Sequence, residues 1–86
     1  MTPNDVKDEI IKKLGATLQA ARTKKKYSIA ALSNITGISI SYISQLENGV
    51  RQNASILIYL ELAYSLDLKP SELFSSLDDM NVFKSK

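Results

Sequence analysis

Apolar side chains recur along the chain every three or four positions, the spacing of helices rather than of strands. Over the first helical stretch the inward positions are Ile10, Leu14, Leu18 and Ala21. Thr2 suits an N-cap and Pro3 the first turn, so this part predicts a helix from about Pro3 or Asp5 to Lys25. Gly15 either weakens the middle of this helix or lets a neighbouring element approach closely.

Two short helices are predicted next, and their ends are marked by serine, asparagine and glycine. Ser28 caps the second helix, and Gly37 ends it in a left-handed conformation. The inward positions of this helix are Ile29, Leu32 and either Ile35 or Thr36. Ser39 caps the third helix, which runs to about Glu47 and stops at Asn48-Gly49. Two short helices joined by such a turn form a helix-turn-helix, whose second helix enters the major groove of DNA.

The third helix has two contrasting faces. At about 100° per residue, Ile43 and Leu46 face inward, whereas Ser41 and Gln45 point away from them. Glutamine can bond adenine N6 and N7 together, and serine can bond several base edges. The pattern is therefore compatible with base reading, and equally with a short amphipathic helix whose polar face is only solvated.

Glu47 lies beside the inward positions of the third helix, where an unpaired carboxylate would be costly. Arg22 lies at the edge of the inward stripe of the first helix, one turn after Leu18. We therefore predict a structural ion pair between Arg22 and Glu47, which locks the first helix onto the end of the third.

The second half of the chain is more apolar. Residues 50–54 are predicted to form a loop, and Ser55 caps a fourth helix that runs to about Leu66. This helix is apolar almost all round, which indicates cover on more than one side, either from a second copy of the chain or from the protein's own core. Pro70 begins a fifth helix with Leu73, Phe74 and Leu77. Beyond it, Met80 and Phe83 either extend this helix or fray.

Composition narrows the chemistry. The chain has 86 residues, enough for one small domain, and contains neither cysteine nor histidine. This excludes disulfides, the usual zinc sites and histidine-based catalysis, so we expect no metal, no cofactor and no enzymatic activity. No apolar run approaches the roughly 20 residues of a membrane span, and the polar, acidic start is unlike a signal peptide. We therefore expect a cytoplasmic protein with no membrane partner.

Charge is distributed unevenly along the chain. Residues 1–26 hold seven basic and three acidic side chains, whereas residues 52–86 hold three basic and five acidic ones. The basic part either favours a polyanionic partner or is an ordinary solvated surface. The Lys24-Lys25-Lys26 run at the end of the first helix likewise either suits the helix dipole or adds phosphate contacts.

A set of residues between positions 14 and 74 is typical of one family. The set comprises Leu14-Gly15, Arg22, Ser28, Leu32, Gly37, Ser39, the run SYISQLENG from Ser41 to Gly49, and downstream Leu60, Ala63, Leu66, Pro70, Leu73 and Phe74. The chain thereby resembles the Cro/cI-type, xenobiotic-response-element-like helix-turn-helix regulators, also called lambda-repressor-like. The resemblance implies an all-α fold of five helices, a homodimer on a roughly palindromic double-stranded DNA operator, and control of transcription.

The resemblance also implies roles for individual residues. Base contacts would come from Ile40, Ser41, Ser44 and Gln45, and phosphate contacts from Ser28, Ser39, Tyr42, Asn48 and Arg51. Ile29 and Ile40 stand where the family often has polar residues, and Ile40 either touches a thymine methyl group or edges the core. Ala54 stands where the family usually has proline.

Taken together, these patterns predict a helix-turn-helix DNA-binding domain over residues 1–77 and a short carboxy-terminal tail over residues 78–86. The expected partners are an operator and a second copy bound through the fourth and fifth helices, aided by Leu77, Met80 and Phe83. No small-molecule ligand is expected. The alternative function is an antitoxin or adaptor that mainly binds a protein partner, which the apolar Ile29 and Ile40 favour.

Overall fold

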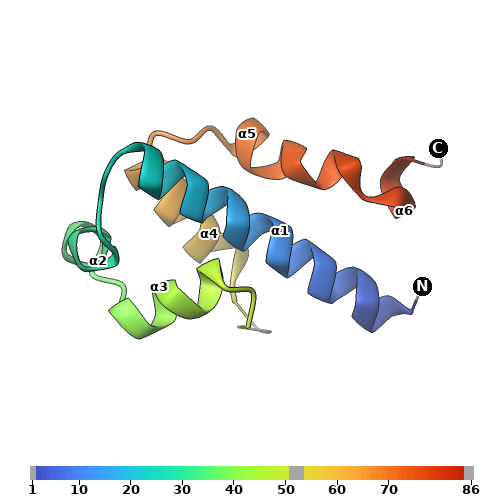
Figure 1. Cartoon of the computed structure of the whole chain (residues 1–86), viewed down its shortest axis with the longest axis horizontal. Helices are drawn as coiled ribbons and strands as arrows, with labels where there is room; N and C mark the ends of the chain where they lie inside the picture. Colours follow the sequence, from blue (N-terminus) through green and yellow to red (C-terminus); the bar gives the residue numbers. More distant parts are fainter. Residues whose placement is uncertain (1, 51–53, 85–86) are drawn as a thin grey trace.

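The structure, a computed structural model, describes residues 2–50 and 54–84. Its elements are α1 (Pro3–Lys24), α2 (Ile29–Thr36), α3 (Ile40–Glu47), α4 (Ile56–Ser65), α5 (Pro70–Ser75), the 3-10 helix η1 (Ser76–Asp79) and α6 (Asn81–Lys84). The long α1 crosses the molecule, with α2 and α3 on one side of it and the α5–η1–α6 segment on the other (Figure 1). The all-α prediction is confirmed, and none of these helices is long and apolar enough to span a bilayer.

Side-chain caps and left-handed glycines set the helix ends where the sequence predicts them. The hydroxyl groups of Thr2, Ser28, Ser39 and Ser55 each accept a backbone N–H from the first turn of the following helix. Gly37 and Gly49 have φ angles of 77° and 69°, which only glycine adopts without cost. The local sequence therefore determines where α2 and α3 begin and where the chain turns after them.

One hydrophobic cluster joins all the larger helices. Its buried members are Leu14, Leu18, Leu32, Ile43, Leu46, Tyr59, Leu62, Ala63, Leu66 and Leu73. One detail differs from the inward stripes that the sequence predicts, and another decides between the two alternatives left for the second helix. Ile11 of α1 is buried while Ile10 is only half-buried. In α2 it is Thr36 that turns inward, since Thr36 is half-buried while Ile35 is exposed, and the Thr36 hydroxyl donates to the Leu32 carbonyl oxygen.

The segment after α5 neither continues that helix nor frays. It tightens into η1 and then forms the short α6, and η1 packs against α1. Met80 is 1% exposed and is therefore a core residue. A side chain buried in this way cannot contact a second copy, so the part suggested for Met80 in a dimer is wrong. The predicted division after Leu77 falls within η1 and stays a prediction.

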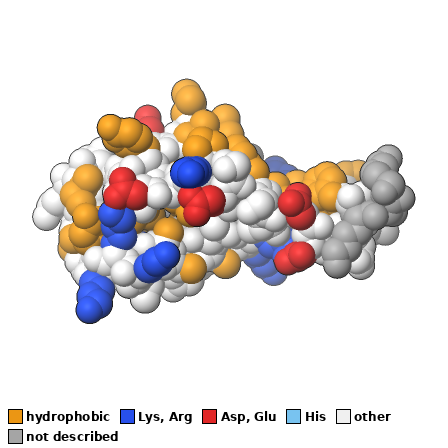
Figure 2. Space-filling view, turned by 90° about the horizontal axis from the view of Figure 1, so that it is seen from above, with side chains coloured by type: hydrophobic (Ala, Val, Ile, Leu, Met, Phe, Trp, Pro, Cys, Tyr) orange, Lys and Arg blue, Asp and Glu red, His pale blue; other side chains and the backbone are white. Residues whose placement is uncertain are grey.

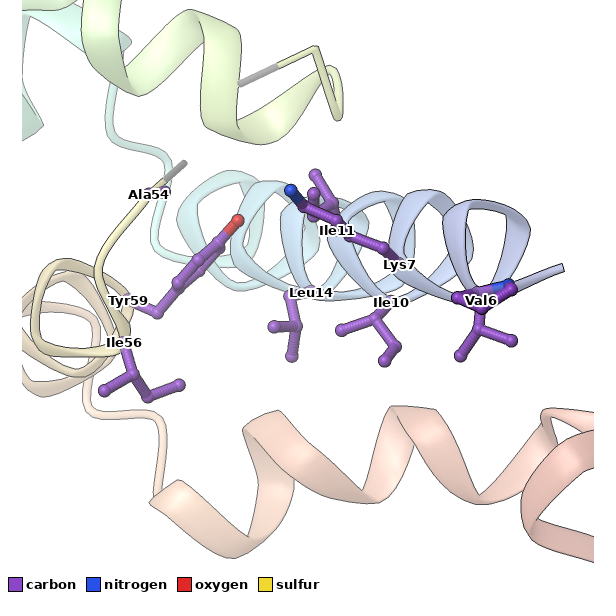
Figure 3. A pocket seen from close by; sticks show the side chains of 9 residues that line it. Val6, Lys7, Ile10, Ile11, Leu14, Ala54, Ile56 and Tyr59 are labelled. Carbon is purple, nitrogen blue, oxygen red and sulfur yellow. The ribbon is translucent and has the colours of Figure 1, made fainter. Parts of the chain in front are cut away.

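A pocket of about 390 Å³ lies between the amino-terminal half of α1 and the start of α4. Val6, Ile10 and Leu14 project from one side of α1 beside it, and Ile56 lies across from them (Figure 3). Tyr59 also lines the pocket and is 3% exposed, yet its hydroxyl has no hydrogen-bond partner among the described residues. Burial raises the pKa of Tyr59, and Tyr42 adds a smaller effect in the same direction.

Candidate nucleic-acid interface

The outward side of α3 carries the four predicted base-reading residues together. At about 100° per residue, Ile40, Ser44, Ser41 and Gln45 fall within an arc of about 140°. Ile40 and Ser41 are exposed, and Ser44 and Gln45 are partly exposed. The three buried residues of the helix, Ile43, Leu46 and Glu47, all lie outside this arc. We call the four residues the α3 outer arc.

The opposite side of α3 is pressed against α1. A Cβ atom added at Gly15 would lie 2.0 Å from the Leu46 carbonyl oxygen and 3.0 Å from that of Glu47. Only a residue without a side chain permits this approach. Of the two alternatives for Gly15, the structure therefore supports the close approach of a neighbour.

Arg22 and Glu47 meet at the end of the same contact. Arg22 Nε donates to Glu47 Oε2 at 2.7 Å, and Nη2 donates to Oε1 at 3.0 Å. Arg22 Nη1 also donates to the Tyr27 carbonyl oxygen at 2.7 Å, so one guanidinium group joins α1, α3 and the turn before α2. The side chains are only 13% and 3% exposed, and the hydrogen bond to Glu47 raises the pKa of Arg22 further. The contribution of this pair to stability stays a prediction.

The predicted phosphate-binding residues lie around the ends of α2 and α3. Ser28 and Ser39 are exposed N-caps, whose hydroxyls accept from the Ala31 and Tyr42 N–H groups at 3.0 and 3.1 Å. Exposed helix amino termini attract anions, because their free N–H groups and the helix dipole favour negative charge. Backbone N–H groups at these two helix starts could therefore bind a phosphate together with the serine side chains.

Three further predicted phosphate contacts lie after the start of α3. Tyr42 is half-buried and packs against the hydrophobic cluster. Asn48 is exposed, and its side-chain amide donates to the Ser44 carbonyl oxygen at 2.9 Å. Asn48 therefore helps to close α3, and part of its hydrogen-bonding capacity is used within the chain. Arg51 lies outside the described residues.

The two isoleucines that depart from the family pattern have different surroundings. Ile29 is half-buried and packs against the hydrophobic cluster, as Ala54 does. Ile40 is 53% exposed and lies on the α3 outer arc. Its exposure favours the outward one of the two alternatives for Ile40, and contact with a thymine methyl group stays a prediction.

The lysine run at the end of α1 is partly engaged within the chain. Lys25 forms an ion pair with Asp67, which lies in the turn between α4 and α5, and this hydrogen bond raises the pKa of Lys25. The face opposite α3 shows acidic and basic side chains intermixed rather than a basic patch (Figure 2). The charge of Lys25 is thus balanced locally, and whether the run contacts phosphate stays a prediction.

A second exposed surface lies on α4 and is apolar. Tyr59, Leu62 and Ala63 face the core, whereas Leu57 and Tyr64 on the other side are 64% and 85% exposed. A groove beside Tyr64 is lined by residues of three elements, including Ile35, Leu60 and Leu68. We call Leu57, Leu60, Tyr64 and Ile35 the α4 outer surface. The sequence predicts no contact surface at Ile35, and the only sign of its exposure is that either Ile35 or Thr36 could be the inward position of the second helix.

The geometry defines a helix-turn-helix domain, with α2 and α3 as its two short helices. Comparison with known proteins agrees, because a family model described as helix-turn-helix matches residues 18–73. The chain is also 33% identical over 63 residues to the HTH-type transcriptional regulator SlrR of Bacillus subtilis (strain 168). That similarity covers 73% of this chain and 41% of SlrR, so the chain spans about two fifths of the relative's length. The chain belongs to the Cro/cI-type helix-turn-helix family, whose members are DNA-binding transcription regulators.

Proposed function

We propose that this protein is a sequence-specific transcription regulator that inserts α3 into the major groove of an operator. The observation that carries the proposal is the α3 outer arc. Its serines and its glutamine lie on the outward side of the helix, while Ile43 and Leu46 anchor the opposite side in the core. Side chains of this chemistry read base edges, and the amino-terminal residues of such a helix are the ones that usually do so.

The proposed roles divide into base reading and phosphate binding. Ile40, Ser41, Ser44 and Gln45 would read bases. Phosphate contacts would come from Ser28, Ser39, Tyr42, Asn48 and Arg51. The first set would determine which sequence is preferred, and the second would set the register and the overall affinity.

Selection of bound duplexes from a random pool tests this division. Gln45→Ala should change the preferred bases at one position of each half-site, while Arg51→Ala should weaken all sequences alike and lower the salt dependence. Gln19→Ala, which changes an exposed glutamine of α1, is the matched control and should alter neither property. A wild-type protein that enriches no sequence at modest ionic strength would refute the proposal.

The protein is further proposed to act as a homodimer on a palindromic operator, through α4 and α5. The α4 outer surface supports this, because α4 has apolar side chains on both sides and the protein's own core buries only one of them. A second copy would bury the other side. A two-fold pair would also place two recognition helices about 34 Å apart, the spacing of successive major grooves.

Sedimentation velocity measures this association directly. The double variant Leu57→Ser, Tyr64→Ser should shift the protein toward monomer, because each change removes an exposed apolar side chain from the contact. Val50→Ser removes an exposed apolar side chain that lies outside α4, α5 and the tail, and should leave the association unchanged. A wild-type protein that stays monomeric at tens of micromolar, with and without operator, would contradict the dimer.

A second candidate function is that of an antitoxin or adaptor whose main partner is another protein. The same α4 outer surface favours it, because an exposed apolar surface accepts a foreign partner as well as a second copy. A mobility-shift assay with the selected duplex pool separates the two functions. Failure to retard any duplex would favour the protein-binding function.

A further inference from the structure

We infer that Ile40 reads a pyrimidine C5 methyl group, that of thymine or of 5-methylcytosine, at one position of each operator half-site. This inference rests on the proposed insertion of α3 into the major groove. It specifies which base the amino-terminal end of α3 contacts, and it predicts that binding depends on cytosine methylation at that position.

The geometry places Ile40 on the side of α3 that faces DNA when the helix enters the groove. Ile40 is the first residue of α3 and directly follows the exposed cap Ser39. It is 53% exposed. On the wheel it lies about 40° from Ser44 and about 100° from Ser41, so it enters the groove together with them.

The chemistry of the groove then selects the contact. The other three residues of the α3 outer arc carry hydroxyl or carboxamide groups that can form hydrogen bonds with base edges, but an isoleucine side chain carries none. Pressed against a base N–H or carbonyl group, it would strip that group of water without replacing the hydrogen bond, which is unfavourable. The C5 methyl of thymine is the apolar group that the major groove displays. Contact with it removes apolar surface on both sides from water.

Cytosine methylation follows from the same geometry. A methyl group at C5 of cytosine occupies the same place in the major groove as the methyl group of thymine. An isoleucine that selects thymine by this group should therefore distinguish 5-methylcytosine from cytosine as well. The operator would then carry a position at which base modification strengthens binding.

Removal of single methyl groups from the selected operator provides the test. Each thymine is replaced in turn by deoxyuridine, which lacks only the methyl group. For the wild-type protein, one replacement per half-site should weaken binding about fourfold, the factor expected for one buried methyl group. At that same position, a 5-methylcytosine–guanine pair should bind about fourfold more tightly than a cytosine–guanine pair.

Variants identify the side chain responsible. Ile40→Ala should lose both methyl effects, while Ile40→Val, which keeps a branched aliphatic side chain, should retain a large part of them. Val50→Ala, which changes an exposed aliphatic residue beyond the other end of α3, should leave the effects at this position unchanged. Thermal unfolding of each variant verifies that it is folded under the binding conditions.

The outcomes are distinguishable. A protein that binds the operator but is indifferent to every thymine methyl group overturns the inference and leaves the proposed function standing. Methyl effects that persist in Ile40→Ala also overturn it, because another side chain then reads the group. A wild-type protein that binds no duplex overturns the proposed function, and the inference with it.

Discussion

The two sides of α1 are packed in different ways. Toward α3, the backbones come together at Gly15, and the Arg22–Glu47 pair satisfies its polar groups with two hydrogen bonds. Toward α4, the contact is made by side chains and includes a pocket of about 390 Å³ and the unpaired hydroxyl of Tyr59 (Figure 3). On this side, among the described residues, one ion pair links the end of α1 to the turn after α4. It is formed by Lys25 and Asp67 and is exposed to solvent.

This difference matches the roles proposed for the two helices. Reading bases requires a helix held in one position, since hydrogen bonds to base edges tolerate little displacement. Close backbone approach and a bidentate ion pair provide such positioning. The helix proposed to carry a protein contact is held by less specific packing, and its outer surface is apolar.

The largest expected effect comes from breaking the ion pair on the α3 side. Arg22→Ala should lower the free energy of unfolding by about 3–5 kcal/mol, because it leaves the Glu47 carboxylate buried and unpaired. The double variant Arg22→Met, Glu47→Leu is the control. It should cost less than the single change, since no charge stays buried. Chemical denaturation measures both, and a loss of only a few tenths of a kcal/mol for Arg22→Ala would show that the pair is not structural.

The second effect tests the close approach of α1 to α3. Gly15→Ala should lower the free energy of unfolding by about 1–3 kcal/mol, because the new Cβ meets the Leu46 carbonyl and forces the helices apart. Helix propensity alone would give a gain of about 1 kcal/mol, so the sign of the change decides. Ala16→Gly, at the exposed neighbouring position, should cost about 1 kcal/mol through propensity alone. A more stable Gly15→Ala protein would contradict the tight contact.

Much of the α3 side can be predicted from the sequence because each of its interactions depends on one or two identifiable residues. Ser39 and Gly49 determine the ends of α3, and the polar and apolar positions between them determine its orientation. The ion pair follows from a carboxylate at an inward position and an arginine on the facing stripe. In each case the residue type allows one arrangement of low energy: a serine at a helix start, a glycine in the left-handed conformation, or an inward carboxylate paired with a cation.

The α4 side is harder to predict because an all-round apolar helix has no preferred face. Nothing in its sequence distinguishes buried Tyr59 from exposed Tyr64, and the distinction comes from what α1 and α2 leave uncovered. The same is true of the tail, where the burial of Met80 depends on where η1 meets α1. Side-chain packing between distant segments therefore has to be seen in the structure.

The third effect tests the imperfect packing on the α4 side. Tyr59→Phe should raise the free energy of unfolding by about 1 kcal/mol at neutral pH, because it removes a buried hydroxyl without a partner. Denaturation with Tyr64→Phe, an exposed tyrosine of the same helix, is the control and should show no change. A clear loss in Tyr59→Phe would mean that the hydroxyl makes a favourable hydrogen bond.

The pH dependence of the same variant gives an independent measurement. Burial raises the pKa of Tyr59, so above about pH 10, the ordinary pKa of tyrosine, the unfolded chain releases this proton before the folded one does. The folded state then binds more protons, and stability falls as the pH rises. The difference in unfolding free energy between Tyr59→Phe and wild type should therefore widen above pH 10 in favour of the variant.

The smallest effect is expected from the exposed ion pair. Lys25→Ala removes the Lys25–Asp67 interaction, but solvent screens it and two mobile side chains must be ordered to form it. We expect a denaturation midpoint that is indistinguishable from that of the wild type, with and without added salt. Asp67→Asn serves as the comparison from the partner side and should behave alike. If Lys25→Ala instead lost stability comparably to Arg22→Ala, the α4 side of α1 would depend on a fixed polar contact as the α3 side does, and the difference between the two sides would not hold.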